Sequence, residues 1–218
     1  MSLSMTIILS QCTNRKTGGI AGRISSDNFI PGTQSEIFGQ WRSKILPFKE
    51  SSQRFETLKA EELYCGRSFS EVKKSRSTLN ADLYIISMGF GLIESTRNIP
   101  SYDLTLSGKN GSSLSQKITD TIDYRSWWEQ LNNFLHGNPM PIKTLVEKAN
   151  HSTKKELILI AMSGTYLKMI ERELATISEE NLENVRIITH HSNQLSSSRL
   201  MECRMPYDER LDGDGSPY

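Results

Sequence analysis

The feature that most constrains the fold is a set of short apolar segments that lie far apart along the chain. They are residues 5–11, 82–88, 156–162 and 185–189, each rich in strand-forming residues. Parallel strands require long crossover connections, and strands that are apolar throughout rather than alternating are covered on both faces of their sheet. We therefore expect an α/β fold, a three-layer sandwich with a mostly parallel central sheet and helices on both faces.

Helical patterns fill the long connections between these segments. The stretches concerned are residues 35–46, 55–63, 68–79, 113–122, 124–136, 140–149 and 164–174. Residues 1–191 are predicted to form a single α/β domain. From residue 192 onward the pattern fades, so residues 192–218 are predicted to be a C-terminal extension, either flexible or the start of a truncated region.

Charge and composition exclude several classes of protein. The formal net charge is +1, although the first 80 residues carry an excess of positive charge. This excess indicates either a surface that binds a polyanion or an ordinary solvated face. The three cysteines are too widely spaced for a disulfide framework or a zinc motif, and we expect reduced thiols. No apolar run is long enough to cross a bilayer and no signal peptide is recognised, so we expect a cytoplasmic protein that does not bind membranes.

Polar turns follow three of the predicted strands, and ligands of open parallel sheets bind outside the carboxyl ends of the strands. The first turn contains Cys12, Thr13, Asn14 and Lys16, followed by Gly18-Gly19. Hydroxyl, amide and backbone N–H groups in such a turn favour an anion, with Lys16 as the counter-charge. The alternative is an ordinary polar loop, in which Cys12 is a packing residue and not a nucleophile.

The second turn places two glycines around an aromatic residue, in the order Ser87, Met88, Gly89, Phe90, Gly91. Glycine permits positive φ and a close approach of the backbone to a ligand. The ring of Phe90 is then placed to stack on a planar base. In the alternative interpretation, Phe90 belongs to the core.

The third turn leads from a buried strand directly into a helix through Ser163, Gly164, Thr165 and Tyr166. Free backbone N–H groups and the positive end of the helix suit a phosphate or a carboxylate at such a position. Alternatively, Gly164 only makes the turn and Thr165 is a plain N-cap.

Tyr102 and Asp103 lie in the polar loop that follows the second turn. A carboxylate beside a phenol in a cleft is suited to act as a general base or to stabilise a cationic transition state. The alternative for Asp103 is an Asx-turn or a helix cap. His190 and His191 follow the fourth strand without an acidic third ligand nearby, so we predict no metal site and no cofactor.

Several short motifs follow one another in a defined order. They are Cys12-Thr13-x-x-Lys16, Leu63-Tyr64-Cys65-Gly66, Ser87-Met88-Gly89-Phe90-Gly91-Leu92, Tyr102-Asp103-Leu104-Thr105-Leu106 and Ser163-Gly164-x-Tyr166. The set resembles a largely uncharacterised bacterial and phage family with the pattern Cys-Ser-x-x-Lys, Leu-Tyr-x-Gly, Leu-Ser-Ala-x-x-Gly-Leu, Tyr-Asp-x-Thr-Leu and Ser-Gly-x-x-Tyr. That family is similar to a glycosylase-like domain that accompanies enzymes of deazaguanine modification in tRNA and DNA. The resemblance covers residues 5–106 and 156–175, and Met88 and Phe90 depart from it by replacing smaller residues.

The resemblance directs attention to Lys16, Ser87, Tyr102, Asp103 and Ser163. It implies a protein that handles a nucleotide or a nucleic-acid base, with DNA or tRNA as a candidate partner. Our hypothesis is N-glycosidase or base-exchange chemistry in nucleic-acid modification or in defence against foreign DNA. Glycosidic cleavage develops oxocarbenium character, which a nearby carboxylate stabilises.

The hypothesis assigns a role to each turn. Asp103 is the catalytic carboxylate and Tyr102 orients it, while Lys16 and residues 163–165 hold phosphate and Phe90 stacks the base. Two alternatives remain, namely a non-catalytic nucleotide-sensing module of a defence or signalling system, and a structural component with a vestigial cleft.

Overall fold

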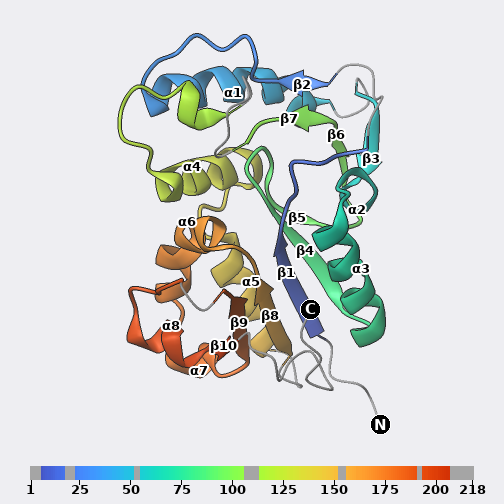
Figure 1. The fold of residues 1–218 in the computed structure, drawn as a ribbon, viewed down its shortest axis with the longest axis vertical. Helices are drawn as coiled ribbons and strands as arrows, with labels where there is room; N and C mark the ends of the chain where they lie inside the picture. Colours follow the sequence, from blue (N-terminus) through green and yellow to red (C-terminus); the bar gives the residue numbers. More distant parts are fainter. Residues whose placement is uncertain are drawn as a thin grey trace.

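A six-stranded sheet forms the centre of the molecule in the computed structural model, which describes residues 6–17, 23–51, 55–105, 113–151, 156–190 and 193–206. Its strand order is β10-β9-β8-β1-β4-β5 (Figure 1). The strands are β1 (Thr6–Gln11), β4 (Asp82–Ser87), β5 (Gly91–Glu94), β8 (Leu157–Ala161), β9 (Val185–Thr189) and β10 (Arg204–Pro206). Helices accompany this sheet, so the α/β class expected from the sequence is confirmed.

The predicted apolar segments account for the middle of the sheet. β1 pairs in parallel with both β4 and β8, β8 pairs in parallel with β9, and β9 pairs in parallel with β10. β4 and β5 pair antiparallel, because residues 88–90 form a turn too short for a crossover. Gly91, which was expected to belong to the turn, therefore starts an edge strand.

Two small sheets lie beyond the carboxyl ends of β1 and β4 (Figure 1). In one, β2 (Ile24–Ser25) runs parallel to β7 (Tyr102–Asp103). In the other, β3 (Thr57–Lys59) pairs antiparallel with β6 (Asn98–Pro100). Segments from distant parts of the sequence are thereby tied to the edge of the main sheet where the polar turns emerge.

The helices largely follow the predicted periodicity. They are α1 (Gln34–Glu50), α2 (Ala60–Leu63), α3 (Arg67–Leu79), α4 (Tyr124–His136), α5 (Pro141–His151), α6 (Gly164–Ala175), α7 (Glu179–Leu182) and α8 (Ser198–Glu202). Two predicted helices were wrong in extent. The stretch 55–63 begins as β3 and becomes helical only at Ala60, and within 113–122 the described helical structure is a 3-10 turn at Leu114–Gln116.

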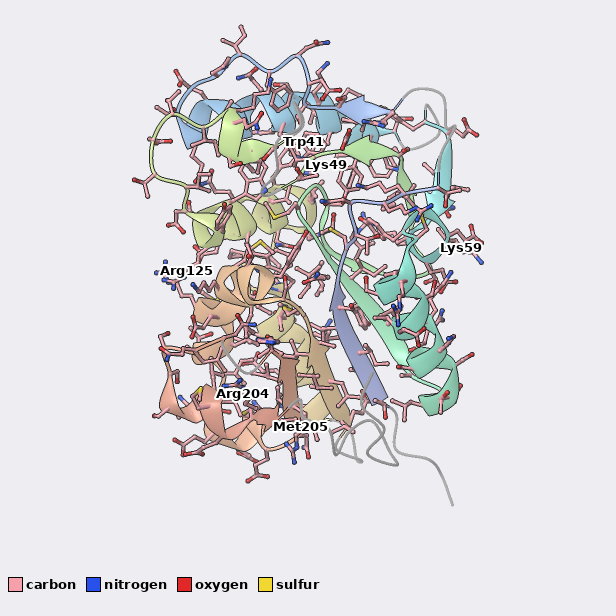
Figure 2. All side chains as sticks on the ribbon, in the orientation of Figure 1. Trp41, Lys49, Lys59, Arg125, Arg204 and Met205 are labelled. Atoms are coloured by element: carbon pink, nitrogen blue, oxygen red, sulfur yellow. The ribbon has the colours of Figure 1, made fainter. Side chains whose placement is uncertain are left out.

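α1 shows how the local sequence and the core cooperate. Thr33 and Glu36 form a capping box that starts the helix. Ile37, Trp41 and Ile45 recur every fourth residue and are fully buried, so they form one apolar face. Trp41 points from α1 toward the turn after β4, where its Nε1 donates to the carbonyl oxygen of Gly89 at 3.0 Å (Figure 2).

The segment after residue 192 contributes to the main sheet. Ser198–Glu202 forms α8, and Arg204 and Met205 in β10 lie opposite Ile187 and Ile188 in β9. This part of the expected C-terminal extension is therefore an edge of the sheet, while residues 207–218 lie outside the described residues. None of the helices described here is both long and apolar enough to span a membrane.

Candidate functional site

The ends of three neighbouring strands meet, as the predicted parallel topology requires. The order β8-β1-β4 puts their carboxyl ends side by side. The Gln11 side chain at the end of β1 accepts hydrogen bonds of 2.7 Å from the backbone N–H and the hydroxyl of Ser163 after β8. On the other side, the backbone N–H of Cys12 donates to Ile86 in β4 at 2.9 Å. The three polar turns thus border one region, which we call the strand-end site.

A buried network of hydroxyl groups forms the floor of this site. The Tyr102 hydroxyl lies 2.8 Å from the hydroxyls of both Ser87 and Tyr64, and the Tyr64 hydroxyl donates to Ser87 at 3.2 Å. None of the three residues is more than 1% exposed. Burial raises the pKa of Tyr64 and of Tyr102 far above the ordinary range, and the neighbouring Cys12 adds to the shift, so both phenols are neutral. The network fixes the walls of the site and has no free base.

Lys16 lies over these aromatic rings. Its ammonium group is 4.2 Å from the ring centre of Tyr102 and 5.9 Å from that of Tyr64. Burial lowers the pKa of Lys16; Cys12 and Cys65 oppose this shift, and the positive charge of Arg23 supports it. Within the part of the chain that the structure describes, no carboxylate pairs with Lys16. A partly desolvated cation of this kind favours an anionic ligand.

The loop that carries Lys16 is held against residues 63–65. Lys16 forms a β-bridge with Tyr64, and the backbone N–H of Cys65 donates to Arg15 at 3.0 Å. The Thr13 hydroxyl is within 2.9 Å of the carbonyl oxygens of Arg15 and Cys65, so it stabilises the loop. Asn14 is exposed. Gly18 and Gly19, the rest of the predicted anion nest, lie outside the described residues.

Cys12 and Tyr166 connect the first and third turns. The Cys12 sulfur lies 3.1 Å from the Tyr166 hydroxyl, and Cys12 is buried. Burial raises the pKa of Tyr166 well above its ordinary value, and Cys12 contributes to the shift. This contact favours a packing role for Cys12 in the wall of the site.

Tyr102 and Asp103 separate, because neighbouring residues of a strand point to opposite faces. Tyr102 points into the hydroxyl network, whereas Asp103 forms an ion pair with Arg23. The side-chain contacts of Tyr102 therefore do not orient the Asp103 carboxylate, contrary to the predicted role. Arg23 orients the Asp103 carboxylate instead, and its positive charge also contributes to the lowered pKa of Lys16. The sequence carried no motif that marked Arg23.

Phe90 lies in the aromatic core instead of presenting a face for base stacking. It is 3% exposed and makes edge contacts with Trp41, Phe48 and Tyr102, with ring centres 5.2 to 6.5 Å apart. Gly89 is required by the core as well, since an added Cβ would lie 2.7 Å from a ring carbon of Tyr102. Gly91 has a φ of +68°, which starts β5 after the turn.

The N-terminus of α6 is partly engaged by the protein itself. Ser163 is the N-cap residue in place of Thr165, and its backbone N–H is taken by Gln11. Gly164 allows Asn193 to approach, because an added Cβ would lie 2.2 Å from the Asn193 amide oxygen. Thr165 is exposed at the surface.

Metal ligation finds no support in the described ranges. No group of three or more His, Cys, Asp or Glu side chains is gathered there in a way that suits a metal ion. His190 is exposed at the end of β9, and His191 is outside the described residues.

Tyr64 and Arg23 contribute to the site and were not among the predicted site residues. Tyr64 had a signal, since it belongs to the Leu63-Tyr64-Cys65-Gly66 motif. Arg23 had none, because its position depends on the pairing of β2 with β7. Comparison with known proteins found no matching family model, no matching curated protein and no matching solved structure.

Proposed function

We propose that the strand-end site binds a nucleotide or a nucleic-acid base and that the protein cleaves or exchanges its N-glycosidic bond. The observation that carries the proposal is Lys16, a cation seated on the Tyr102 ring without a carboxylate partner among the described residues. Beside it, Arg23 holds Asp103. Two cations suit a phosphate, and the carboxylate suits the adjacent sugar.

The chemistry follows from this placement. The bond between C1′ and the base nitrogen breaks, and the departing base takes the electron pair and a proton. Water or an incoming base then forms the new bond at C1′ and gives up a proton, which balances the proton taken by the departing base. The sugar is cationic in the transition state, so the Asp103 carboxylate stabilises it electrostatically. Tyr102 acts through the backbone, because its anchored hydroxyl fixes the strand that carries Asp103. Nucleic-acid modification or defence against foreign DNA is the setting we propose for this activity.

A nucleotide-sensing module is the second candidate. The observation that favours it is the Arg23–Asp103 ion pair, which occupies the carboxylate that catalysis requires. The cations of the site would then bind the ligand without any bond being broken.

Mass spectrometry of released bases and nucleosides tests the proposal. Wild-type protein is incubated with tRNA, DNA and a panel of nucleotides, alongside Asp103→Asn, Lys16→Gln and the control Arg15→Gln, which removes an exposed charge from the same loop. We expect release by wild type and Arg15→Gln, binding without release by Asp103→Asn, and weakened binding by Lys16→Gln. Binding by wild type and Asp103→Asn without any release would support the sensor. If neither protein binds or releases anything, the strand-end site is not a nucleotide site.

A further inference from the structure

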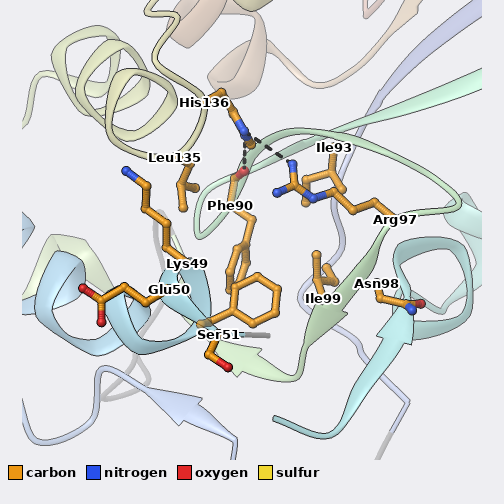
Figure 3. Close-up of a pocket in the computed structure, with 11 residues that line it drawn as sticks. Lys49, Glu50, Ser51, Phe90, Ile93, Arg97, Asn98, Ile99, Leu135 and His136 are labelled. Atoms are coloured by element: carbon orange, nitrogen blue, oxygen red, sulfur yellow. Dashed lines mark hydrogen bonds between the residues drawn. The ribbon is translucent and has the colours of Figure 1, made fainter. Parts of the chain in front are cut away.

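A cavity lies on the other side of Phe90 from the hydroxyl network of the strand-end site. It has a volume of about 780 Å³ and is bounded by the end of α1, the turn before β5, β6 and the end of α4 (Figure 3). Small-molecule sites typically measure a few hundred to about 1,000 Å³. The ring centres of Phe90 and Tyr102 are 5.2 Å apart, so these two side chains form a shared wall between the cavity and the hydroxyl network.

One side of this cavity is apolar. Phe48, Phe90, Ile93, Ile99 and Leu135 line it. Four of them belong to the buried core, so this surface is fixed by packing and needs no rearrangement to receive a ligand. Such a wall suits the hydrocarbon or aromatic body of a small molecule.

Two cations that lack carboxylate partners among the described residues also border the cavity. They are Arg97, which directly precedes β6, and Lys49 on α1, whose ammonium lies on the other side of Leu135 from the Arg97 guanidinium (Figure 3). Lys49 donates to the carbonyl oxygen of Phe134 and lies 4.5 Å from the Phe134 ring centre. Glu50 also borders the cavity, but its carboxylate points away from Arg97 and His136 (Figure 3). Since Lys49 is engaged by Phe134, Arg97 is the cation that the cavity offers to an anion.

His136 fixes the guanidinium of Arg97 in this arrangement. The His136 Nδ1 is 3.4 Å from an Arg97 nitrogen, and its Nε2 is 3.3 Å from the carbonyl oxygen of Phe90 (Figure 3). A guanidinium can only donate, so Nδ1 accepts and the Nε2–H donates to Phe90. Burial lowers the pKa of His136, as do the charges of Arg97 and Lys49, which keeps the imidazole neutral. Among the described residues no other group engages the Arg97 guanidinium, so its remaining donors can meet an anion.

We propose that this cavity binds a small organic anion, with its phosphate or carboxylate against Arg97 and its apolar body against the apolar side of the cavity. Both parts of the ligand are needed, because the cation alone is exposed to competing water and the apolar wall alone gives no orientation. The cavity uses none of the residues assigned to catalysis, so it is a site for a second molecule.

Isothermal titration with four probes tests the proposal. They are phenyl phosphate and benzoate, which carry both features, phenol, which lacks the charge, and inorganic phosphate, which lacks the body. We expect the first two to bind one per chain, with their ratio showing which anion is preferred, and the last two to bind at least tenfold more weakly. Wild-type binding of neither phenyl phosphate nor benzoate at millimolar concentration overturns the proposal, as does equal binding of inorganic phosphate.

Variants locate the binding. Arg97→Gln should weaken phenyl phosphate or benzoate binding about 10- to 100-fold through loss of charge-assisted hydrogen bonds. Arg42→Gln is the matched control, since Arg42 lies on α1 over the Phe134 ring but does not line the cavity. Lys16→Gln should leave this binding unchanged, which separates the result from the fate of the proposed function. If Arg97→Gln folds and binds as wild type does, the cavity is not the site.

Discussion

The stability of the fold should depend on pH through Glu173, a buried carboxylate on α6. Glu173 is 2% exposed, and its two oxygens accept hydrogen bonds from the Trp128 indole at 2.8 Å and the backbone N–H of Lys143 at 2.9 Å. Burial raises the pKa of Glu173 from 4.5 to about 7, and these hydrogen bonds oppose the shift without cancelling it. The folded protein therefore binds this proton more tightly than the unfolded chain does.

The sign and size of the effect follow from linkage. Below about pH 4.5 the group is protonated in both states and its contribution to stability is complete, and this contribution is lost as the pH rises to about 7. Between pH 5 and pH 8 the free energy of unfolding should fall by about 2.5 kcal/mol from this residue alone. Glu173→Gln cannot titrate, so the difference in stability between wild type and variant should change by that amount.

Urea denaturation of both proteins at four pH values between 5 and 8 measures the difference. Any effect of the Gln side chain on the free energy of unfolding that does not depend on pH cancels, because only the change with pH is compared. Glu180→Gln, at an exposed position of α7, is the control for removing a negative charge. Trp128→Phe should extend the decline to higher pH, since it removes a hydrogen bond that lowers the pKa of Glu173. A difference between wild type and Glu173→Gln that stays constant with pH would refute the reasoning.

The remaining predictions concern the strand-end site. Gly89→Ala should lower the free energy of unfolding by about 1–3 kcal/mol, because its Cβ would meet Tyr102 at 2.7 Å; unchanged urea midpoints would contradict this. Tyr102→Phe should lower it by about 1–3 kcal/mol, measured in the same way, because it leaves the buried hydroxyls of Ser87 and Tyr64 with one partner fewer. Lys16 should acetylate at lower pH than an exposed lysine such as Lys74, because its pKa is lowered; competitive labelling read by mass spectrometry checks this, and identical pH profiles would argue against it.

The meeting of the polar turns could be expected from the sequence, because the ends of neighbouring parallel strands lie at one edge of a sheet. Lys16, Ser87 and Tyr102 were predicted from motifs, and the structure gathers them at the adjoining ends of β1 and β4. Their roles were harder to predict. A sequence does not say which of Tyr102 and Asp103 faces the interior, and that choice decided which of them is buried and which pairs with Arg23.

The short strands show the same limit. β2, β3, β7 and β10 have two or three residues each, too few for a periodic pattern. Each is stabilised by a partner that is distant in sequence, as β10 is by β9 and β3 is by β6. For this reason residues 57–59 were mistaken for the start of a helix, and residues 204–206 were placed in an extension.

The sequence by itself determined the long elements of this protein, since runs such as Thr6–Gln11 and Leu157–Ala161 are apolar enough to specify buried strands whatever their neighbours are. The wide spacing of these runs in turn determined the α/β class. Only the tertiary structure decided that Phe90 is a core residue and that Arg97 and His136 meet beside it at a cavity. The physical reason is that the burial of a side chain, and the charges near it, depend on the segments packed around it. These segments are distant in the sequence, so the local pattern around the residue does not contain them.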